Sequence, residues 1–390
     1  MKDIAVLIGN GLSIAYNGNL TIPRITDAIV QRLSEAGADG TQQAQLMRMV
    51  AERAGRRDAR SNFEDLVSPF DELRDTLPLI GRLSDLAGAG GLAVKHALQD
   101  SAQFADQLYR HGVSHVLDVI AMESRAHIEA MTPLRAFVEE VIDSAESGEV
   151  TFANLNYDAL LMAALCWGHE RNLCDLADGR IDAGFYRITD DASALGRPLR
   201  QRGNLPFGRQ ITLLHLHGSL AWLRNPEDGR VYRMAIDDLR RMNYWTEWRL
   251  GHTDWSPVVV LTNQPGKTRL IQEQPFALAY EIFGYRLLTA NKWLIVGTAL
   301  QDDGVNAMLR QAWSGRSTPP QVLLITKGPN PTRKHFLNAI GWDPVWRGDP
   351  PIEKWLHISR DGIFAAPTSP EWAFWQIGTE VRRSTTQLPV

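Results

Sequence analysis

The sequence predicts a Rossmann-like, doubly wound α/β fold with a mostly parallel sheet and a large helical insertion after the first strand. Short β-rich apolar runs recur along the chain, and helical patterns follow several of them, as at residues 157–170 and 275–290. A long stretch with helical period and no convincing strand separates the first run from the second. Alternating strands and helices are typical of a parallel sheet covered by helices on both faces.

Six apolar runs are predicted to be buried strands, because each is short, rich in β-branched residues and bounded by polar or turn-forming residues. They are Ile4–Ile8, Val150–Leu155, Ile211–His217, Val258–Thr262, Trp293–Thr298 and Val322–Thr326.

Three units are expected along the chain. Residues 1–24 and 150–330 would form the α/β domain, residues 25–149 a helical insertion, and residues 331–390 a C-terminal segment that packs on the core through its tryptophans. Helix start signals recur in the insertion, namely Thr26 with Asp27, a capping box at Ser61–Glu64, and Thr132 followed by Pro133.

The composition is that of an ordinary globular protein. With 390 residues, 44% hydrophobic residues and a net charge of -4, the chain has material for a large core and no general affinity for polyanions. Two cysteines, Cys166 and Cys174, are too few for a disulfide scaffold or a four-thiolate zinc site. No signal peptide or membrane-spanning run is evident, so we expect a soluble, cytoplasmic protein with no membrane partner.

Polar residues follow the predicted strands, where ligands bind in open parallel sheets. These segments are Gly9–Ser13, Asn156–Asp158, His217–Ser219 and Gly297–Asp302, and further polar residues follow at Thr262–Asn263 and Thr326–Gly328. If the strands are parallel, one crevice holds all of them.

The loop after the first strand is suited to a phosphate, because glycines allow close backbone approach. Gly9 and Gly11 match a dinucleotide fingerprint, but Ile14 stands where its third glycine belongs, and no ribose-binding acid follows at the usual distance. A hydride-transfer dehydrogenase is therefore disfavoured. The structural alternative is a tight turn without a ligand.

Two other patterns are weaker. Gly266-Lys267-Thr268 resembles the end of a Walker loop, but Leu261 replaces its first glycine and Pro265 lacks an amide donor, so ATPase chemistry is disfavoured. Lys267 is left to meet a phosphate or an acidic neighbour. The histidines supply no plausible metal-ligand set, and we expect no metal site.

His217 and Asn156 are the strongest candidates for chemistry. His217 lies at a strand end, where a side chain can reach a ligand, whereas His215 lies deeper in the strand and is interpreted as structural. Asn156 and Asp158 alternate on their strand and are suited to recognising a carboxamide, although either residue could also cap the following helix.

These segments resemble the sirtuin-like family of NAD-binding domains, especially its bacterial antiphage NAD-hydrolase branch. The matching pieces are Ile8–Ser13, Asn154–Asp158, His217–Ser219 and Gly297–Asp302, which occur in the family's order. The chain lacks the four-cysteine zinc module of the protein deacylases, and Ile22–Ile25 replaces their Ile-Pro-Asp-Phe-Arg loop. NAD+ hydrolysis is therefore expected rather than deacylation.

The resemblance implies roles for individual residues. Asn156 and His217 would be catalytic, and the NAD+ contacts would be Gly9, Asn10, Gly11, Ser13, Asp158, Gly297, Thr298 and Asp302. Replacing Gly11 by valine is expected to weaken NAD+ binding more than folding. The resemblance also implies a metal-independent antiphage effector that releases nicotinamide and ADP-ribose, acts as a homo-oligomer, and has a partner ATPase or nucleic-acid-sensing protein. The alternative is a non-catalytic sensor that binds NAD or ADP-ribose, or an interaction subunit of a defence complex.

Overall fold

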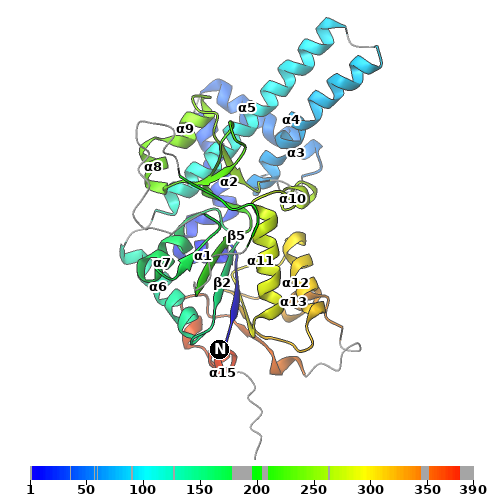
Figure 1. Cartoon of the computed structure of the whole chain (residues 1–390). Helices are drawn as coiled ribbons and strands as arrows, with labels where there is room; N and C mark the ends of the chain where they lie inside the picture. The colour runs from blue at the N-terminus through cyan, green and yellow to red at the C-terminus, as the bar shows by residue number, and fades with distance from the viewer. Residues whose placement is uncertain are drawn as a thin grey trace, which may run out of the picture.

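The computed structural model describes residues 2–35, 37–56, 58, 60–88, 91–125, 128–177, 196–203, 210–261, 264–343 and 351–377. Among these residues, seven strands form a parallel sheet in the order β11-β10-β9-β1-β2-β5-β3, with helices on both faces (Figure 1). The predicted Rossmann-like α/β fold is confirmed. The strands are β1 (Ile4–Ile8), β2 (Val150–Asn154), β3 (Leu173–Cys174), β5 (Ile211–His215), β9 (Lys292–Val296), β10 (Gln321–Ile325) and β11 (Leu356–Ser359).

β1 lies inside the sheet, with β2 on one side and β9 on the other. All five of its residues are buried, which explains its continuous apolar sequence. Alternate side chains enter the two apolar layers: Ile4, Val6 and Ile8 face one layer, and Ala5 and Leu7 the other. The first layer includes α1 (Gly11–Tyr16), α6 (Ile128–Asp143), α7 (Leu160–His169) and α15 (Pro370–Ile377); the second includes α11 (Phe276–Thr289), α12 (Asp303–Gly315) and α13 (Arg333–Ile340).

The chain between β1 and β2 is helical, as expected. Apart from α1 and α6, it forms the short 3-10 helix η1 (Gly18–Leu20) and the helices α2 (Ile22–Glu35), α3 (Ala38–Arg53), α4 (Phe63–Leu86) and α5 (Leu92–Glu123). The predicted start signals were misplaced. Thr26 and Pro133 lie inside helices, and Asn62 rather than Ser61 caps α4 by accepting a hydrogen bond from the Glu64 amide. Helix starts are poorly localised because serine, threonine and proline also occur within helices.

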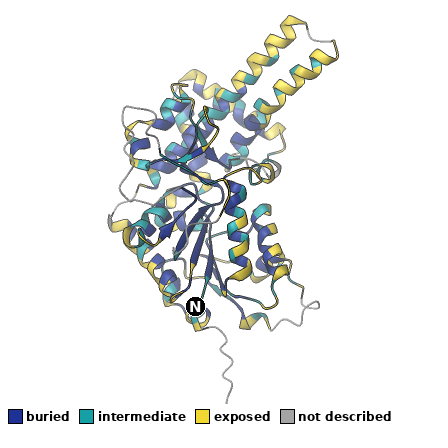
Figure 2. Cartoon of the chain, viewed as in Figure 1, coloured by how far each residue is buried: buried dark blue, intermediate teal, exposed yellow. Residues whose placement is uncertain are grey.

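The outer part of α4 and α5 projects from the molecule as a helical hairpin (Figures 1 and 2). Within its described residues, 72–88 and 91–104, every side chain is exposed or only partly buried. Its large exposed apolar side chains are Leu79, Ile80, Leu83, Leu86, Leu92, Val94 and Phe104. A two-helix hairpin with these side chains in water lacks a partner for its apolar surface.

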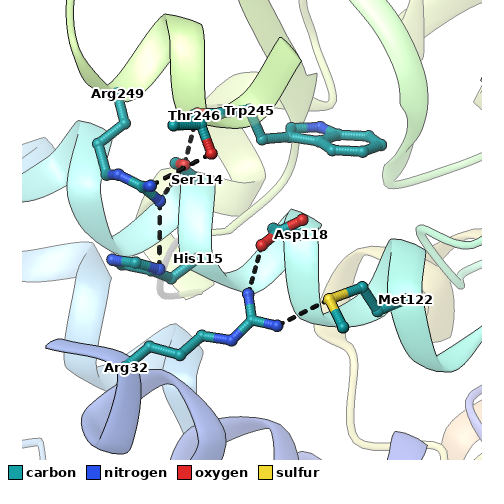
Figure 3. Close-up of polar contacts among 8 residues, drawn as sticks. All are labelled: Arg32, Ser114, His115, Asp118, Met122, Trp245, Thr246 and Arg249. Atoms are coloured by element: carbon teal, nitrogen blue, oxygen red, sulfur yellow. Dashed lines mark hydrogen bonds and ion pairs between the residues drawn. The ribbon is translucent and has the colours of Figure 1, made fainter. Parts of the chain in front are cut away.

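A partly buried polar cluster joins the base of the insertion to α9 (Tyr244–Arg249) (Figure 3). On α5, the Ser114 hydroxyl donates to the backbone oxygen of Trp245 at 2.6 Å. The Arg249 guanidinium lies 3.2 Å from the Ser114 hydroxyl and 3.3 Å from Nδ1 of His115. Arg32 of α2 pairs with Asp118 one turn further along α5. These contacts fix α2, α5 and α9 to one another.

A second sheet is formed by one strand that precedes β5 and three that follow it. It is antiparallel, in the order β4-β7-β6-β8, and its strands are β4 (Arg197–Pro198), β6 (Gly218–Arg224), β7 (Val231–Arg233) and β8 (Ser256–Val259). The prediction that Val258–Thr262 joins the parallel strands was wrong, because this segment pairs antiparallel with β6 after the short helices α8 (Ile236–Arg241) and α9. Thr262 and Asn263 lie outside the described residues. The predicted strand Ile211–His217 ends earlier, at His215.

The C-terminal segment contributes a strand to the main sheet, since β11 pairs with β10. Trp355, Trp372 and Trp375 are fully buried. The short helices η3 (Ile352–Lys354) and η4 (Ala366–Thr368) connect these parts. Among the described residues, no helix combines the length and apolar character needed to cross a membrane.

Candidate functional site

The strand register brings the predicted site residues to one edge of the sheet. Ile8 pairs with Asn154 of β2 and with Val296 of β9, and Asn154 pairs with His215 of β5. The segments that follow these strands therefore begin at the same level. The order of the sheet reverses at β1, because the chain passes from β1 to β2 on one side and returns to β9 on the other. Ligands bind at such a switch point in open α/β sheets.

The glycines at this edge touch each other. The Gly11 amide donates to the carbonyl oxygen of Gly297 at 2.8 Å, and a Cβ added to Gly11 would lie 2.5 Å from Cα of Gly297. A Cβ on Gly9 would lie 2.7 Å from Cβ of Thr298. The space beside Gly11 is filled by backbone, so a side chain there would disturb the fold, and its effect on NAD+ binding stays a prediction.

Asn156 is held at the edge by the chain around it. Its Nδ2 donates to the carbonyl oxygen of Gly9 at 3.1 Å, and its own amide donates to Oδ1 of Asn154 at 3.2 Å. Both asparagines are buried. Asn154 is thus a supporting residue whose role the sequence analysis did not assign, although it belongs to the same Asn-Leu-Asn segment.

Ser13 and Asp158 bind each other. The Ser13 hydroxyl donates to Oδ2 of Asp158, while Oδ1 accepts from the amide of Leu160 at 3.0 Å, at the start of α7. Burial raises the pKa of the Asp158 carboxyl despite the hydrogen bond from Ser13. The pair fastens α1 to the segment after β2, and its contact with a ligand stays a prediction.

His217 lies at the junction between the two sheets. Its carbonyl oxygen accepts from the Val260 amide at 2.9 Å, and the next residue, Gly218, has φ +84° and so favours glycine. A Cβ on Gly218 would also lie 2.2 Å from the carbonyl oxygen of Val258. The chain turns sharply here, and this turn leaves the buried imidazole of His217 facing Asp302.

The imidazole Nε2 of His217 lies 3.3 Å from Oδ2 of Asp302. Both atoms are buried, and neither has a hydrogen bond of good geometry within the described part of the chain. Oδ1 of Asp302 accepts from the Val305 amide at 2.9 Å and caps α12. Burial by itself raises the pKa of the Asp302 carboxyl, but contacts with His217 and Val305 outweigh it and hold the pKa below its ordinary value. Asp302 is therefore an anion beside the histidine.

Lys267, Glu64 and Tyr157 extend this pair. Of these three residues, the sequence predicts an acidic neighbour or a phosphate only for Lys267. Its ammonium lies 3.0 Å from Oε2 of Glu64 and 3.6 Å from Oδ2 of Asp302, so it meets acidic neighbours. The Tyr157 hydroxyl lies 2.9 Å from Oε1 of Glu64 and 2.8 Å from the carbonyl oxygen of Val260. The sequence pattern indicates Glu64 only as part of a capping signal.

The segment between β9 and α12 holds a strained residue. Leu300 has φ +57°, which is uncommon for a side chain other than glycine. Its amide donates to Oγ1 of Thr298 at 3.2 Å, and its carbonyl oxygen accepts from Asn306 at 2.9 Å. Strained backbone held in this way is concentrated at functional sites.

Asn10, a predicted NAD+ contact, and His215, interpreted as structural, make other contacts. Asn10 is half-buried, and its side chain donates to the carbonyl oxygen of Leu20 at 3.2 Å. His215 is fully buried with its ring edge-on to Trp222, and burial, together with the charge of Arg233, lowers its pKa to about 4. His215 is a neutral core residue.

No group of three or more histidine, cysteine or acidic side chains suited to a metal is found in the part of the chain that the structure describes. The polar groups at the switch point are instead one imidazole, carboxylates, carboxamides and an ammonium. This donor set is suited to organic ligands that carry amide and hydroxyl groups.

The fold and this edge define a Rossmann-like α/β protein of the kind that binds dinucleotides beyond its strand ends. A comparison with family models matches residues 150–345, half of the chain, to the SIR2-like domain. The chain therefore belongs to the SIR2-like family, and its function is related to NAD. The matched segment contains Asn156, His217 and Asp302, whereas the loop after β1 lies outside it. A search of curated proteins finds no match.

Proposed function

We propose that this chain hydrolyses the bond between nicotinamide and ribose in NAD+. The observation that carries the proposal is the buried His217–Asp302 pair, whose facing nitrogen and oxygen have no good hydrogen bond in the described residues. Buried polar atoms are nearly always paired in folded proteins. Two facing atoms without a well-directed hydrogen bond, at the switch point of a SIR2-like domain, are suited to a bound ligand's hydroxyl group or a water molecule.

The reaction needs no general acid at the leaving group. Nicotinamide departs as a neutral molecule when the bond between C1′ and the pyridinium nitrogen breaks and that nitrogen takes the electron pair. The oxygen of a water molecule then bonds to C1′, and the proton that this water loses passes to a base of the protein and from there to the solvent. Positive charge develops on the ribose during departure, as in other glycoside cleavages.

The residues at this edge of the sheet have different roles in the proposed reaction. His217 accepts the proton of the water or of a ribose hydroxyl, because imidazole is the side chain best suited to proton transfer near neutral pH. The Asp302 carboxylate stabilises the imidazolium that forms. Asn156 orients the carboxamide and the water with its side-chain amide. Gly9, Gly11 and Gly297, with Thr298 beside them, would contact NAD+, as the family resemblance implies.

Product analysis tests this function. The purified chain is incubated with NAD+, and nicotinamide and ADP-ribose are separated chromatographically. Equal release of both products supports the proposal. A chain that binds NAD+, as shown by a thermal shift, but releases neither product, alone or with neighbouring gene products, is a sensor rather than an enzyme. Chelator treatment should leave the rate unchanged, because the proposed steps use no metal.

On the basis of the family resemblance, we also propose a role for this activity in the cell. The chain would act in the cytoplasm as an antiphage effector that depletes NAD+ when it is activated, with a partner ATPase or nucleic-acid-sensing protein as the trigger. Cellular NAD+ measured after phage infection tests this role. NAD+ should fall in cells that carry the wild type and stay constant in cells that carry His217→Ala.

We also propose that the chain forms a homo-oligomer through the projecting hairpin of α4 and α5. Its exposed leucines, valine and phenylalanine supply the apolar area that an interface needs. Residues 72–104 carry three basic and four acidic side chains, so like charges would not keep two hairpins apart.

A further inference from the structure

Lys267 links the helical insertion to the His217–Asp302 pair through buried charges. It belongs to α10 (Gln264–Leu270), Glu64 lies in the first turn of α4, and Asp302 caps α12. The side chains of Lys267, Glu64 and Asp302 are 13%, 22% and 15% exposed. At this burial, charges interact more strongly than they do at the surface.

We propose that Lys267, held by Glu64, is a positioning residue that sets the charge and orientation of the Asp302–His217 pair. The same carboxylate oxygen, Oδ2 of Asp302, faces both the Lys267 ammonium at 3.6 Å and Nε2 of His217 at 3.3 Å. The two nitrogens therefore compete for one acceptor. The proposal rests on the proposed function, because it takes His217 as the proton acceptor.

The signs of the charges define how each residue acts on His217. In the described part of the chain, the charged groups around the His217 imidazole are Asp302 on α12, Lys267 on α10 and Glu64 on α4. The neighbouring neutral groups are the phenols of Tyr157 and Tyr280. The Lys267 cation opposes protonation of His217, whereas the Asp302 anion favours it. Glu64 draws Lys267 away from Asp302, so it favours protonation indirectly.

The electrostatics of Lys267 are consistent with this arrangement. Burial by itself lowers the pKa of its ammonium, but the carboxylates of Glu64 and Asp302 outweigh burial and raise the pKa. Lys267 is thus a cation throughout the physiological range. Burial and the Glu64 carboxylate raise the pKa of the Tyr157 hydroxyl well above its ordinary value, so the phenol stays neutral and contributes a hydrogen bond rather than a charge.

The same two helices carry a second ion pair that serves as an internal control. Arg269 of α10 lies 3.0 Å from Asp75 of α4, but the side chains are 60% and 48% exposed. Such a surface pair is screened by water and salt. It joins the same elements as the Lys267–Glu64 pair without reaching His217.

The test is a pH titration of the His217 imidazole by NMR in the full chain with 13C-labelled histidine. His217→Gln identifies the signal among those of the ten histidines. We expect Lys267→Met to move the His217 titration midpoint upward by roughly one pH unit, because an opposing charge is removed. Glu64→Gln should move it downward and still accept a hydrogen bond from Tyr157. Lys267→Arg and Arg269→Met should leave it within a few tenths of a unit.

A double variant serves as a control in case the single variants do not fold, because removing one member of a buried ion pair leaves the other charge buried without a partner. Lys267→Met with Glu64→Gln removes both, and its midpoint should lie between those of the single variants. The proposal is overturned if the midpoints of Lys267→Met and Glu64→Gln shift in the same direction or do not shift. It is also overturned if Arg269→Met shifts the midpoint as much as they do. The titration needs no turnover, so it decides the coupling even if the chain cleaves no NAD+. If the chain does cleave NAD+, the acidic limb of the pH–rate profile should move with the midpoints.

Discussion

Nε2 of His217 lies 3.3 Å from Oδ2 of Asp302, although the two residues follow different strands on opposite sides of β1. The imidazole comes from the junction between the two sheets, and the carboxylate caps α12. The pair therefore spans the switch point of the main sheet. A shift of β5 against β2, or of β9 against β1, would change the distance between these two atoms.

Asp302→Asn tests the charge in this pair. Asparagine keeps an oxygen that can cap α12, so the chain should fold, as measured by circular dichroism. It cannot stabilise an imidazolium as a carboxylate does, and we expect the turnover of NAD+ to fall by about 100-fold or more. Asp303→Asn, at the adjacent exposed position, is the matched control and should keep nearly full turnover. An Asp302→Asn enzyme with wild-type turnover contradicts the role of the charge.

Asn156→Ala and His217→Ala test the catalytic assignment. If both side chains act on one transition state, each substitution should lower turnover by about 10²- to 10⁴-fold, and the double variant should add little. NAD+ binding should persist in calorimetry, because the glycines and Thr298 remain. Nicotinamide and ADP-ribose release measure the rate. Near wild-type cleavage by a folded single variant would return that residue to a structural role.

The sequence predicted the parallel sheet well, because fully buried strands are continuous apolar runs. Ile4–Ile8 matches β1 residue for residue. Residues 258–262 have the same apolar character, but Val258 and Val259 belong to β8, which pairs antiparallel with β6. An apolar run indicates burial and not the direction of pairing, which depends on contacts far along the chain.

The candidate site was predictable to the extent that its residues follow strands of the parallel sheet. Asn156, His217 and Asp302 do so. Glu64 does not, since it begins a helix of the insertion and reaches the edge only through the packing of α4 against α10. The capping residue Asn62 explains the start of that helix, but no local signal shows what the Glu64 side chain contacts.

Gly11→Ala tests the glycine contact. The added Cβ would meet the backbone of Gly297, which cannot move as a flexible side chain does, and we expect a loss of about 1–3 kcal/mol in the free energy of unfolding. Gly18→Ala is the matched control, because a Cβ there has no neighbour within 4 Å, and it should change stability by no more than about 0.5 kcal/mol. Chemical denaturation measures both. Equal stabilities for the two variants would show that the loop after β1 can shift away from β9.

Leu83→Glu with Leu86→Glu tests assembly through the hairpin. Leu83 and Leu86 are 66% and 87% exposed, so charge at these positions should not disturb the core. In light scattering after gel filtration, we expect the wild type to exceed the 43.6 kDa of one chain and the double variant to approach it. Leu250→Glu, an exposed leucine on another surface, should leave the mass unchanged. A wild type that elutes as a monomer at all concentrations contradicts this interface.

His115 makes folding sensitive to acid. Burial, with the nearby charge of Arg249, lowers its pKa to about 3 from an ordinary value near 6.5. Between these values the unfolded chain binds a proton that the folded chain excludes, so stability rises with pH across this window and is lost as the pH falls below about 6.5. At pH 5 the loss due to His115 is about 2 kcal/mol. The buried His215 acts in the same direction, because its pKa is also lowered.

His115→Gln should therefore flatten the dependence of stability on pH between pH 7 and pH 5 without removing it, since His215 remains. Glutamine does not titrate, and its side-chain oxygen can accept from Arg249 in the cluster of Figure 3. His252→Gln is the control, because His252 is exposed and pairs with Glu247 at the surface, and its slope should match that of the wild type. Urea denaturation at a series of pH values gives the slopes. If His115→Gln keeps the full wild-type slope, the imidazole accepts a proton in the folded chain, and the polar cluster that joins α2, α5 and α9 opens in acid before the molecule unfolds.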